Sequence, residues 1–303
     1  MDAKKIVMFV IFCIIGVFFT FDINNSNTDP ISKNTNTTIM PYLDVEYDLH
    51  NKIDETAKYG DLDDIIKRGK LVVCSTKKEN PLFQMKVGNG YIGEDIELAY
   101  KISKALNVKL VYKIAYESYE DVVNAIENGE GDIGVSKLSY TEQRARKVLF
   151  TDPYVISRYS LLVNRLAIER NERKTIKEIL NNKDISISVA KGTSYKNYAN
   201  KLFPNALIQE FKDWEGTVLK EVSSGSLTAT MRDEIRCSLL INSYPFLLLK
   251  VMPLILKNKA DNIHAIVNKK SITLLAWINR FIKSNYTAKS AIELISKYKE
   301  FLK

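Results

Sequence analysis

The stretch GEGDIGVSKLSYTEQRARKVLFTDPY, residues 129–154, decides the fold of this 303-residue chain. Within it, Asp132–Ser136 (DIGVS) is a short apolar run of the kind that forms a buried strand. The amphipathic segment Tyr119–Asn128 comes just before it and is stopped by Gly129, a residue that commonly follows the last turn of a helix. A helix that leads directly into a buried strand indicates an α/β unit.

The residues upstream continue this alternation. Leu71–Ser75 (LVVCS) and residues 109–115 (KLVYKIA) are predicted strands, because both are short runs rich in β-branched and aromatic residues. Between them, Asp95–Leu106 has apolar residues at helical spacing, and Asp95 is a suitable N-cap. The order strand, helix, strand, helix, strand predicts an open α/β sheet.

The same pattern returns further along the chain. Ile185–Ala190 (ISISVA) is a predicted strand, and the turn Gly192-Thr193-Ser194 leads from it into a helix. Further strands are predicted at residues 207–211, 227–231 and 263–268. Two α/β lobes separated by a cleft fit this pattern better than one long sheet, since ligands bind at the carboxyl ends of such strands.

The N-terminus differs from this body. Ile6–Phe21 is an uninterrupted apolar run behind Lys4 and Lys5, as in an export signal, but no small-x-small cleavage site follows it. Residues 1–23 are therefore expected to be a signal peptide or an N-terminal anchor. Residues 24–58 are rich in Asn, Thr and Ser and are expected to be a polar flexible linker. The globular part is expected to begin near residue 59.

The composition excludes several functions. The chain has 44 Lys and Arg against 36 Asp and Glu, a formal charge of +8, but without a basic stripe interleaved with aromatic residues, so a nucleic-acid partner is not expected. Cys13, Cys74 and Cys237 have no metal-ligand spacing. Cys74 and Cys237 are expected to be small buried residues, and spacing alone leaves a disulfide between them open. We expect neither a metal nor another cofactor.

Residues 129–154 resemble the segment of family 3 extracellular solute-binding proteins that ends the ligand site of their first lobe. That family has a small hydroxyl residue, a Thr, an Arg and a Phe-Ser-x-Pro-Tyr-like close, and here Ser139, Thr141, Arg144 and Phe150–Tyr154 stand in those places. Weaker matches follow in the family's order, at residues 69–73, 93–99 and 192–194 and at Asp233.

The resemblance covers roughly residues 60–303 and implies an α/β type II periplasmic binding protein fold, with two lobes, a hinge and an interlobe cleft. Residues 59–158 would begin lobe 1, residues 159–261 would form lobe 2, and residues 262–303 would return to lobe 1. The family implies an exported protein that carries an amino acid to the membrane permease of an ABC transporter.

The chemistry of these residues suits an amino acid. The planar guanidinium of Arg144 can grip a carboxylate through two hydrogen bonds, while Ser139 and Thr141 add further donors. The turn Gly192-Thr193-Ser194 opens a helix whose N-terminus favours an anion. Asp233 is expected to receive the ammonium group. Thr141 could instead cap the next helix, and Asp233 could instead be a plain N-cap.

Three positions depart from the family. Glu94 and Glu79 stand where the family often has aromatic residues that sandwich the ligand, and Lys137 replaces a frequent Gly before Ser139. The two carboxylates could favour a ligand with a cationic side chain, or they could point to solvent. Lys137 could neutralise one of them. An aromatic wall could come from other side chains near the site: Phe83, Tyr91 or Tyr140.

Binding of a small polar carboxylate is thus the leading hypothesis, in a monomeric, non-enzymatic protein of the periplasm or cell envelope, with its N-terminal segment as a possible inner-membrane anchor. An exported enzyme similar to cyclohexadienyl dehydratase is the first alternative. It would need a general acid, for which Glu79, Glu94 and Glu234 are the candidates. A ligand-sensing domain that signals through another chain is the second alternative.

Overall fold

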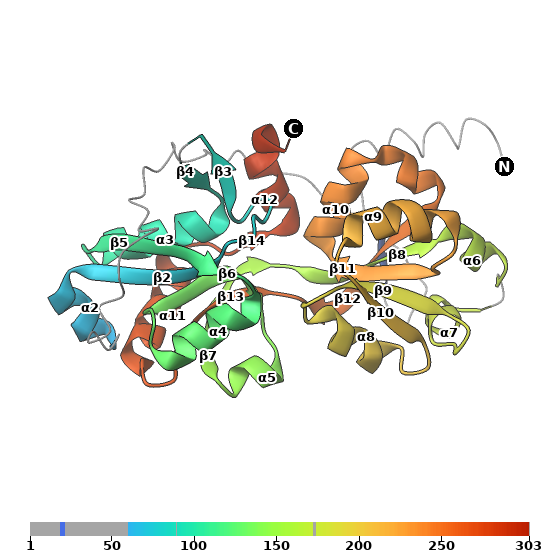
Figure 1. Ribbon diagram of the computed structural model, residues 1–303. Coiled ribbons are helices and arrows are strands. Elements are labelled where there is room, and N and C mark those ends of the chain that lie inside the picture. Colours follow the sequence, from blue (N-terminus) through green and yellow to red (C-terminus); the bar gives the residue numbers. More distant parts are fainter. Residues whose placement is uncertain (1–18, 22–59, 89, 172–173, 303) are drawn as a thin grey trace. The chain divides into compact units, whose positions relative to one another are not determined.

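A computed structural model describes residues 19–21, 60–88, 90–171 and 174–302 of the chain. These residues form two compact units, one containing residues 157–261 and the other containing residues up to 156 together with 262–303 (Figure 1). The predicted linker 24–58 lies outside the described residues, as does the predicted signal or anchor segment except for Phe19–Phe21, which forms strand β1. None of the helices in the described ranges is long and apolar enough to cross a membrane.

The unit that contains residues 60–156 is built on a six-stranded sheet of order β14-β7-β13-β6-β2-β5. Strands β2, β5 and β6 are mutually parallel, and β13 runs antiparallel to both β6 and β7. The strands are β2 (Lys70–Thr76), β5 (Lys109–Tyr116), β6 (Ile133–Ser139), β7 (Val148–Ile156), β13 (Ile263–Asn268) and β14 (Lys289–Ser290), and a hairpin adds β3 (Met85–Val87) and β4 (Gly90–Ile92).

Helices lie on both faces of this sheet (Figure 1). They are α2 (Leu62–Arg68), α3 (Glu94–Ala105), α4 (Tyr119–Asn128), α5 (Glu142–Ala145), α11 (Ile272–Asn285) and α12 (Ala291–Tyr298), followed by the 3₁₀ turn η3 (Lys299–Phe301).

The stretch that decided the fold behaves as its sequence predicts. Ser118 and Asp121 form a capping box at the start of α4, and Gly129 ends the helix in the left-handed conformation with φ 77°. Every residue of β6 is buried. The apolar face of α4 packs on this sheet through Val122 and Ile126, next to Cys74 of β2. The predicted helix and strand are therefore confirmed.

The second unit has its own six-stranded sheet, of order β1-β12-β8-β11-β9-β10. Strand β8 is antiparallel to β11 and β12, and β9 is parallel to β10 and β11. Strands β9, β10, β11 and β12 therefore end at the same edge of the sheet. The strands are β8 (Arg158–Asn164), β9 (Ser186–Ala190), β10 (Leu207–Phe211), β11 (Ala229–Asp233) and β12 (Val251–Ala260).

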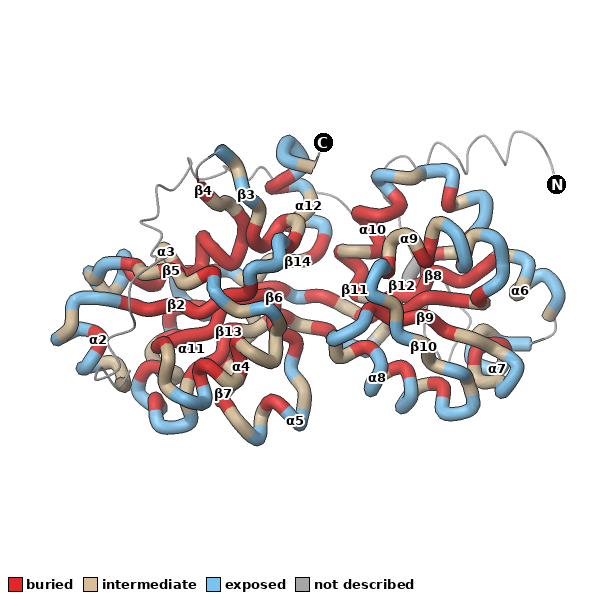
Figure 2. Tube along the Cα trace, viewed as in Figure 1, coloured by how far each residue is buried: buried red, intermediate tan, exposed pale blue. Residues whose placement is uncertain are grey.

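The two faces of this sheet carry separate hydrophobic clusters. Leu161 and Val163 of β8 pack toward α8, whereas Leu162 between them packs toward Trp214 and Cys237, as the alternation of side chains along a strand requires. Buried positions accordingly run along the strands in Figure 2. The helical segments are α6 (Arg165–Glu169), α7 (Ile176–Leu180), α8 (Tyr195–Leu202), α9 (Trp214–Thr217), the π turn η1 (Val218–Val222), α10 (Glu234–Ser243) and the 3₁₀ turn η2 (Pro245–Leu249).

Two features of this unit differ from the sequence-based expectations. The strand predicted at residues 227–231 lies two residues later, at Ala229–Asp233, so Asp233 is its last residue. Strand β12 was not predicted, because Pro253 and the polar end of VMPLILKNKA interrupt the apolar pattern. A Pro is tolerated there because β12 lies near the margin of the sheet, flanked on its outer side only by the three residues of β1. Cys74 and Cys237 are buried and free, so they form no disulfide.

Candidate functional site

The structure brings Ser139, Thr141 and Arg144 together at the end of β6. Ser139 is the last residue of that strand, and the hydroxyl of Thr141 accepts the backbone N–H of Arg144 at 3.1 Å as the N-cap of α5. Nη1 of Arg144 donates to the backbone carbonyl of Ser139 at 3.0 Å. The capping role considered for Thr141 is therefore confirmed.

Arg144 is held in place by two hydrogen bonds and is only 5% exposed. Besides its bond to Ser139, its Nε donates to Oε1 of Glu120 at 2.8 Å, and the Glu120 side chain is half exposed. A guanidinium has five N–H groups, and these contacts engage Nε and Nη1. The Nη2 amino group is thus the part of Arg144 that can hydrogen-bond to an incoming carboxylate.

Lys137, two residues before Ser139, is also buried. Its backbone has φ 46°, a left-handed conformation that costs a non-glycine residue roughly 1–2 kcal/mol. Its Nζ lies 5.1 Å from the centre of the Phe83 ring, within the range of a cation–π interaction. This strand end therefore carries the cations of Lys137 and Arg144 close together in sequence.

Asp95 lies buried in the first turn of α3 and interacts with the same strand end. Tyr154 donates a hydrogen bond to Asp95 at 2.6 Å. Burial raises the pKa of Asp95 to about 7, although the hydrogen bonds from Tyr154 and from the backbone of Lys137 act in the opposite direction. Near neutral pH this carboxyl group is therefore partly protonated.

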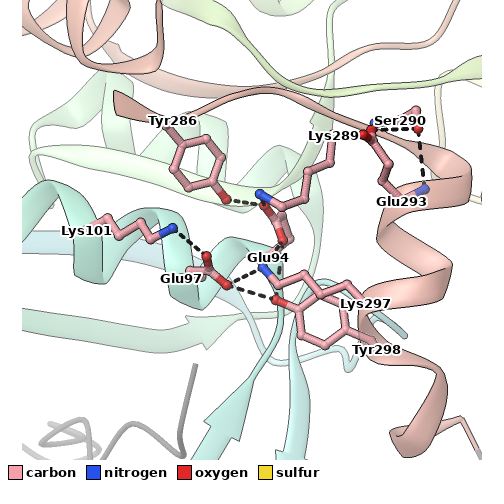
Figure 3. A network of polar contacts seen from close by, with 9 residues as sticks. All are labelled: Glu94, Glu97, Lys101, Tyr286, Lys289, Ser290, Glu293, Lys297 and Tyr298. Carbon is pink, nitrogen blue, oxygen red and sulfur yellow. Dashed lines mark hydrogen bonds and ion pairs between the residues drawn. The ribbon is translucent and has the colours of Figure 1, made fainter. Parts of the chain in front are cut away.

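Glu94 belongs to a network of charged and polar side chains that joins α3 to the C-terminal helix α12 (Figure 3). Its side chain is fully buried. Tyr286 and Lys289 contact Oε1, with Lys289 at 2.9 Å, while Lys297 at 2.9 Å and Tyr298 at 3.3 Å contact Oε2. Every one of these four partners is a hydrogen-bond donor.

Glu97 extends this network by one turn of α3. It forms ion pairs with Lys101, at 2.7 Å, and with Lys297. Burial alone would raise the pKa of Glu97, but the hydrogen bonds and charges of Lys101 and Lys297 outweigh it and lower that pKa. The network therefore holds two carboxylates among three ammonium groups, and none of the contacts of Glu94 goes to Ser139, Thr141 or Arg144. Glu79, the other predicted acidic position, is exposed.

In the other unit, the turn Gly192-Thr193-Ser194 follows β9 as predicted. Gly192 has φ 74°, a conformation that glycine adopts readily. Thr193 Oγ1 donates to the carbonyl of Ala190 at 2.6 Å, and Ser194 precedes the first turn of α8. A hydrogen bond from Lys196 and the backbone N–H of Gly192 lower the pKa of Glu210. The amide of Gly192 is thus engaged within the protein.

Asp233 is fully buried at the end of β11. Its Oδ1 accepts the backbone N–H of Arg236 at 2.9 Å, so it is the N-cap of α10, as one of the two sequence-based readings expected. Its Oδ2 lies 3.0 Å from the hydroxyl of Tyr195 and 3.8 Å from Nε of Arg232. The structure therefore places Asp233 in a polar cluster as well as at a helix terminus.

Sequence reasoning missed Tyr195 and Asp261 in this cluster. The hydroxyl of Tyr195 lies 2.7 Å from Oδ2 of Asp261, which directly follows β12. Tyr195 could have been noticed because it directly follows the Gly-Thr-Ser turn. No local signal marks Asp261, since the strand that delivers it was itself not predicted.

The matching family model confirms the resemblance. Residues 71–301 match the bacterial extracellular solute-binding proteins, family 3. The chain therefore belongs to this family of solute-binding proteins, and its two α/β units are consistent with the type II periplasmic binding protein fold.

Individual similar proteins include both an enzyme and binding proteins. The chain is 24% identical over 184 residues to a cyclohexadienyl dehydratase of Pseudomonas aeruginosa, covering 61% of this chain and 66% of that protein. It is 29% identical over 172 residues to a glutamine-binding protein of Geobacillus stearothermophilus, covering 55% and 63%. The matches thus span less than two thirds of the length of these relatives.

A solved structure described as an ancestral cationic amino acid solute-binding protein is similar over most of the chain. It has a TM-score of 0.56 and 27% sequence identity, and the match covers 80% of this chain and 99% of that one.

Proposed function

We propose that this protein is an exported binding protein that captures an amino acid or a similar small polar carboxylate and delivers it to the membrane permease of an ABC transporter. Membership of the extracellular solute-binding family supports export and binding. The observation that carries the proposal is Arg144, a buried guanidinium fixed at the end of β6 by Ser139 and Glu120.

Arg144 is prepared for a carboxylate. Its orientation is set before any ligand arrives, which reduces the entropy lost on binding. A carboxylate that meets Nη1 and Nη2 together would form a bidentate pair, stronger and more directional than a single hydrogen bond. In this proposal the ligand's ammonium group binds Asp233, and the two units act as the two lobes that hold the ligand. The turn at residues 192–194 adds polar groups from the second lobe.

The enzymatic alternative rests on the similarity to the dehydratase and on one group in this chain. Burial raises the pKa of Glu234, as a general acid requires, although the charge of Arg158 opposes this shift. Nε and Nη2 of Arg158 contact Oε2 of Glu234 at 2.9 and 2.8 Å. A carboxylate that is paired with Arg in this way is a poor proton donor, and Glu94 is enclosed by its four donors. We therefore favour binding over catalysis.

The location and assembly of the protein belong to the same proposal. A protein of this family acts outside the cytoplasm, and residues 1–23 would serve as its signal peptide or as an anchor in the inner membrane. We propose that it acts as a monomer. A sensor role would require retention of the N-terminal segment in the membrane and a signalling partner, and no observation favours that role over transport.

A thermal-shift screen tests the proposal. The full chain, purified in mild detergent, is heated with each of the standard amino acids and with a set of small carboxylates. A ligand at about 100 times its Kd should add roughly 2.7 kcal/mol to stability. Arg144→Ala should remove this stabilisation, and Arg144→Lys, which keeps the charge but loses the fork, should restore little of it. Stabilisation that persists undiminished in Arg144→Ala would contradict the role of Arg144.

A further inference from the structure

Three segments that are far apart in sequence meet at the carboxyl edge of the sheet in the unit of residues 157–261. Asp233 ends β11, Asp261 follows β12, and Tyr195 begins α8 shortly after β9. The Tyr195 hydroxyl lies 3.0 Å from Oδ2 of Asp233 and 2.7 Å from Oδ2 of Asp261. Carboxyl edges of α/β sheets are where ligands of such folds bind.

The hydroxyl of Tyr195 has a single hydrogen to donate to these two carboxylates. Burial, together with the negative charges of Asp233 and Asp261, raises the pKa of Tyr195 well above its ordinary value, so the hydroxyl stays protonated. The shorter distance to Asp261 favours donation in that direction. Oδ2 of Asp233 then lacks this hydrogen and can accept one from another donor.

The ring of Tyr195 is fixed by its neighbours, so that only the hydroxyl hydrogen is able to turn. Tyr195 is 5% exposed, and Tyr159 packs edge-on against it with ring centres 5.9 Å apart. Tyr159 itself stacks on Tyr198, with ring centres 3.7 Å apart. On the other side, the guanidinium of Arg232 lies 5.9 Å from the Tyr195 ring centre. Removal of either carboxylate would therefore redirect the hydrogen toward the one that remains.

We propose that Asp261 is a positioning residue for ligand recognition, which takes the hydrogen of Tyr195 and thereby leaves Asp233 as an acceptor for the ligand's ammonium group. This inference rests on the proposed function and narrows it to ligands that carry an ammonium, such as amino acids, over carboxylates that lack one. Arg232 is the resident cation beside Asp233. With the ammonium bound, two cations face the two carboxylates.

The test compares amino acids with their desamino counterparts by isothermal calorimetry on the full chain. Asp261→Ala should weaken the amino acid that stabilises the wild type by about 10-fold, because the Tyr195 hydrogen then turns to Asp233 and weakens it as an acceptor. Binding of the desamino acid should change little. Asp261→Asn, whose side-chain carbonyl still accepts the hydrogen, should restore most of the affinity.

A double-mutant cycle separates this mechanism from simple damage to the fold. In a Tyr195→Phe background no hydrogen can be redirected, so adding Asp261→Ala should cause much less than its usual loss. Equal losses for the amino acid and the desamino acid, or additive losses in the double variant, would overturn the inference. If Arg144→Ala abolishes binding while Asp261→Ala leaves it unchanged, only this inference falls. If no ammonium-bearing compound binds the wild type, both proposals are wrong.

Discussion

Replacing Glu94 by Gln tests whether this residue holds the fold together or contacts ligand. The substitution preserves shape but turns one carboxylate oxygen into an NH₂ donor. Since each oxygen of Glu94 already faces two donors, Tyr286 and Lys289 on Oε1 and Lys297 and Tyr298 on Oε2, the NH₂ group must face donors in either orientation. Breaking a buried ion pair by removing one partner costs about 3–5 kcal/mol.

This cost should appear directly in the melting temperature. For a protein of this size, 1 kcal/mol corresponds to about 2–4 °C, so Glu94→Gln should lower Tm by roughly 6–20 °C. Circular dichroism of wild type and variant without added ligand is the assay. Glu79→Gln, at an exposed position, is the matched control and should stay within about 0.5 kcal/mol of wild type. A Tm change below about 2 °C together with lost ligand binding would refute the structural role and favour ligand contact instead.

Two further predictions concern pH. The pKa of Asp95 is raised to about 7, so the folded state holds a proton that the unfolded chain has already lost, and stability should fall as pH rises from about 4 to about 7; Asp95→Asn should flatten this slope in urea unfolding series, and an unchanged slope would show that another group causes it. The pKa of Glu97 is lowered, so its contribution is present above its unfolded pKa and lost as pH falls below about 4. Glu97→Gln should therefore destabilise the protein at pH 7 more than at pH 3, and equal destabilisation at both would contradict the ion pairs.

The sequence predicted most where local chemistry determines the structure. The capping box at Ser118 and the left-handed Gly129 are encoded within a few neighbouring residues, and the helix between them has the predicted bounds. The Arg144 group could also be found, because Ser139, Thr141 and Arg144 lie within six residues of one another. Such features depend on backbone propensity and short-range hydrogen bonds, which one sequence contains in full.

The rest could not be predicted, because its partners come from distant parts of the chain. Glu94 contacts Tyr286, 192 positions away, and Tyr195 contacts Asp261, 66 positions away. An acidic residue in a predicted cleft has the same local pattern whether it faces a ligand or a buried lysine. Only the tertiary structure shows that Lys289 and Lys297 surround Glu94.

The distribution of charge between the units bears on which ligand the protein takes. The end of β6 in one unit carries the cations Lys137 and Arg144, and the carboxyl edge in the other unit carries Asp233 and Asp261 beside Arg232. An amino acid has a carboxylate and an ammonium on the same carbon, so it can satisfy a group from each unit at once. A simple carboxylate satisfies only the first. In the proposed function, a ligand that bears both charges therefore stabilises the state in which both units are engaged, and one that bears a single charge does so less, which makes the ammonium the group that selects the ligand.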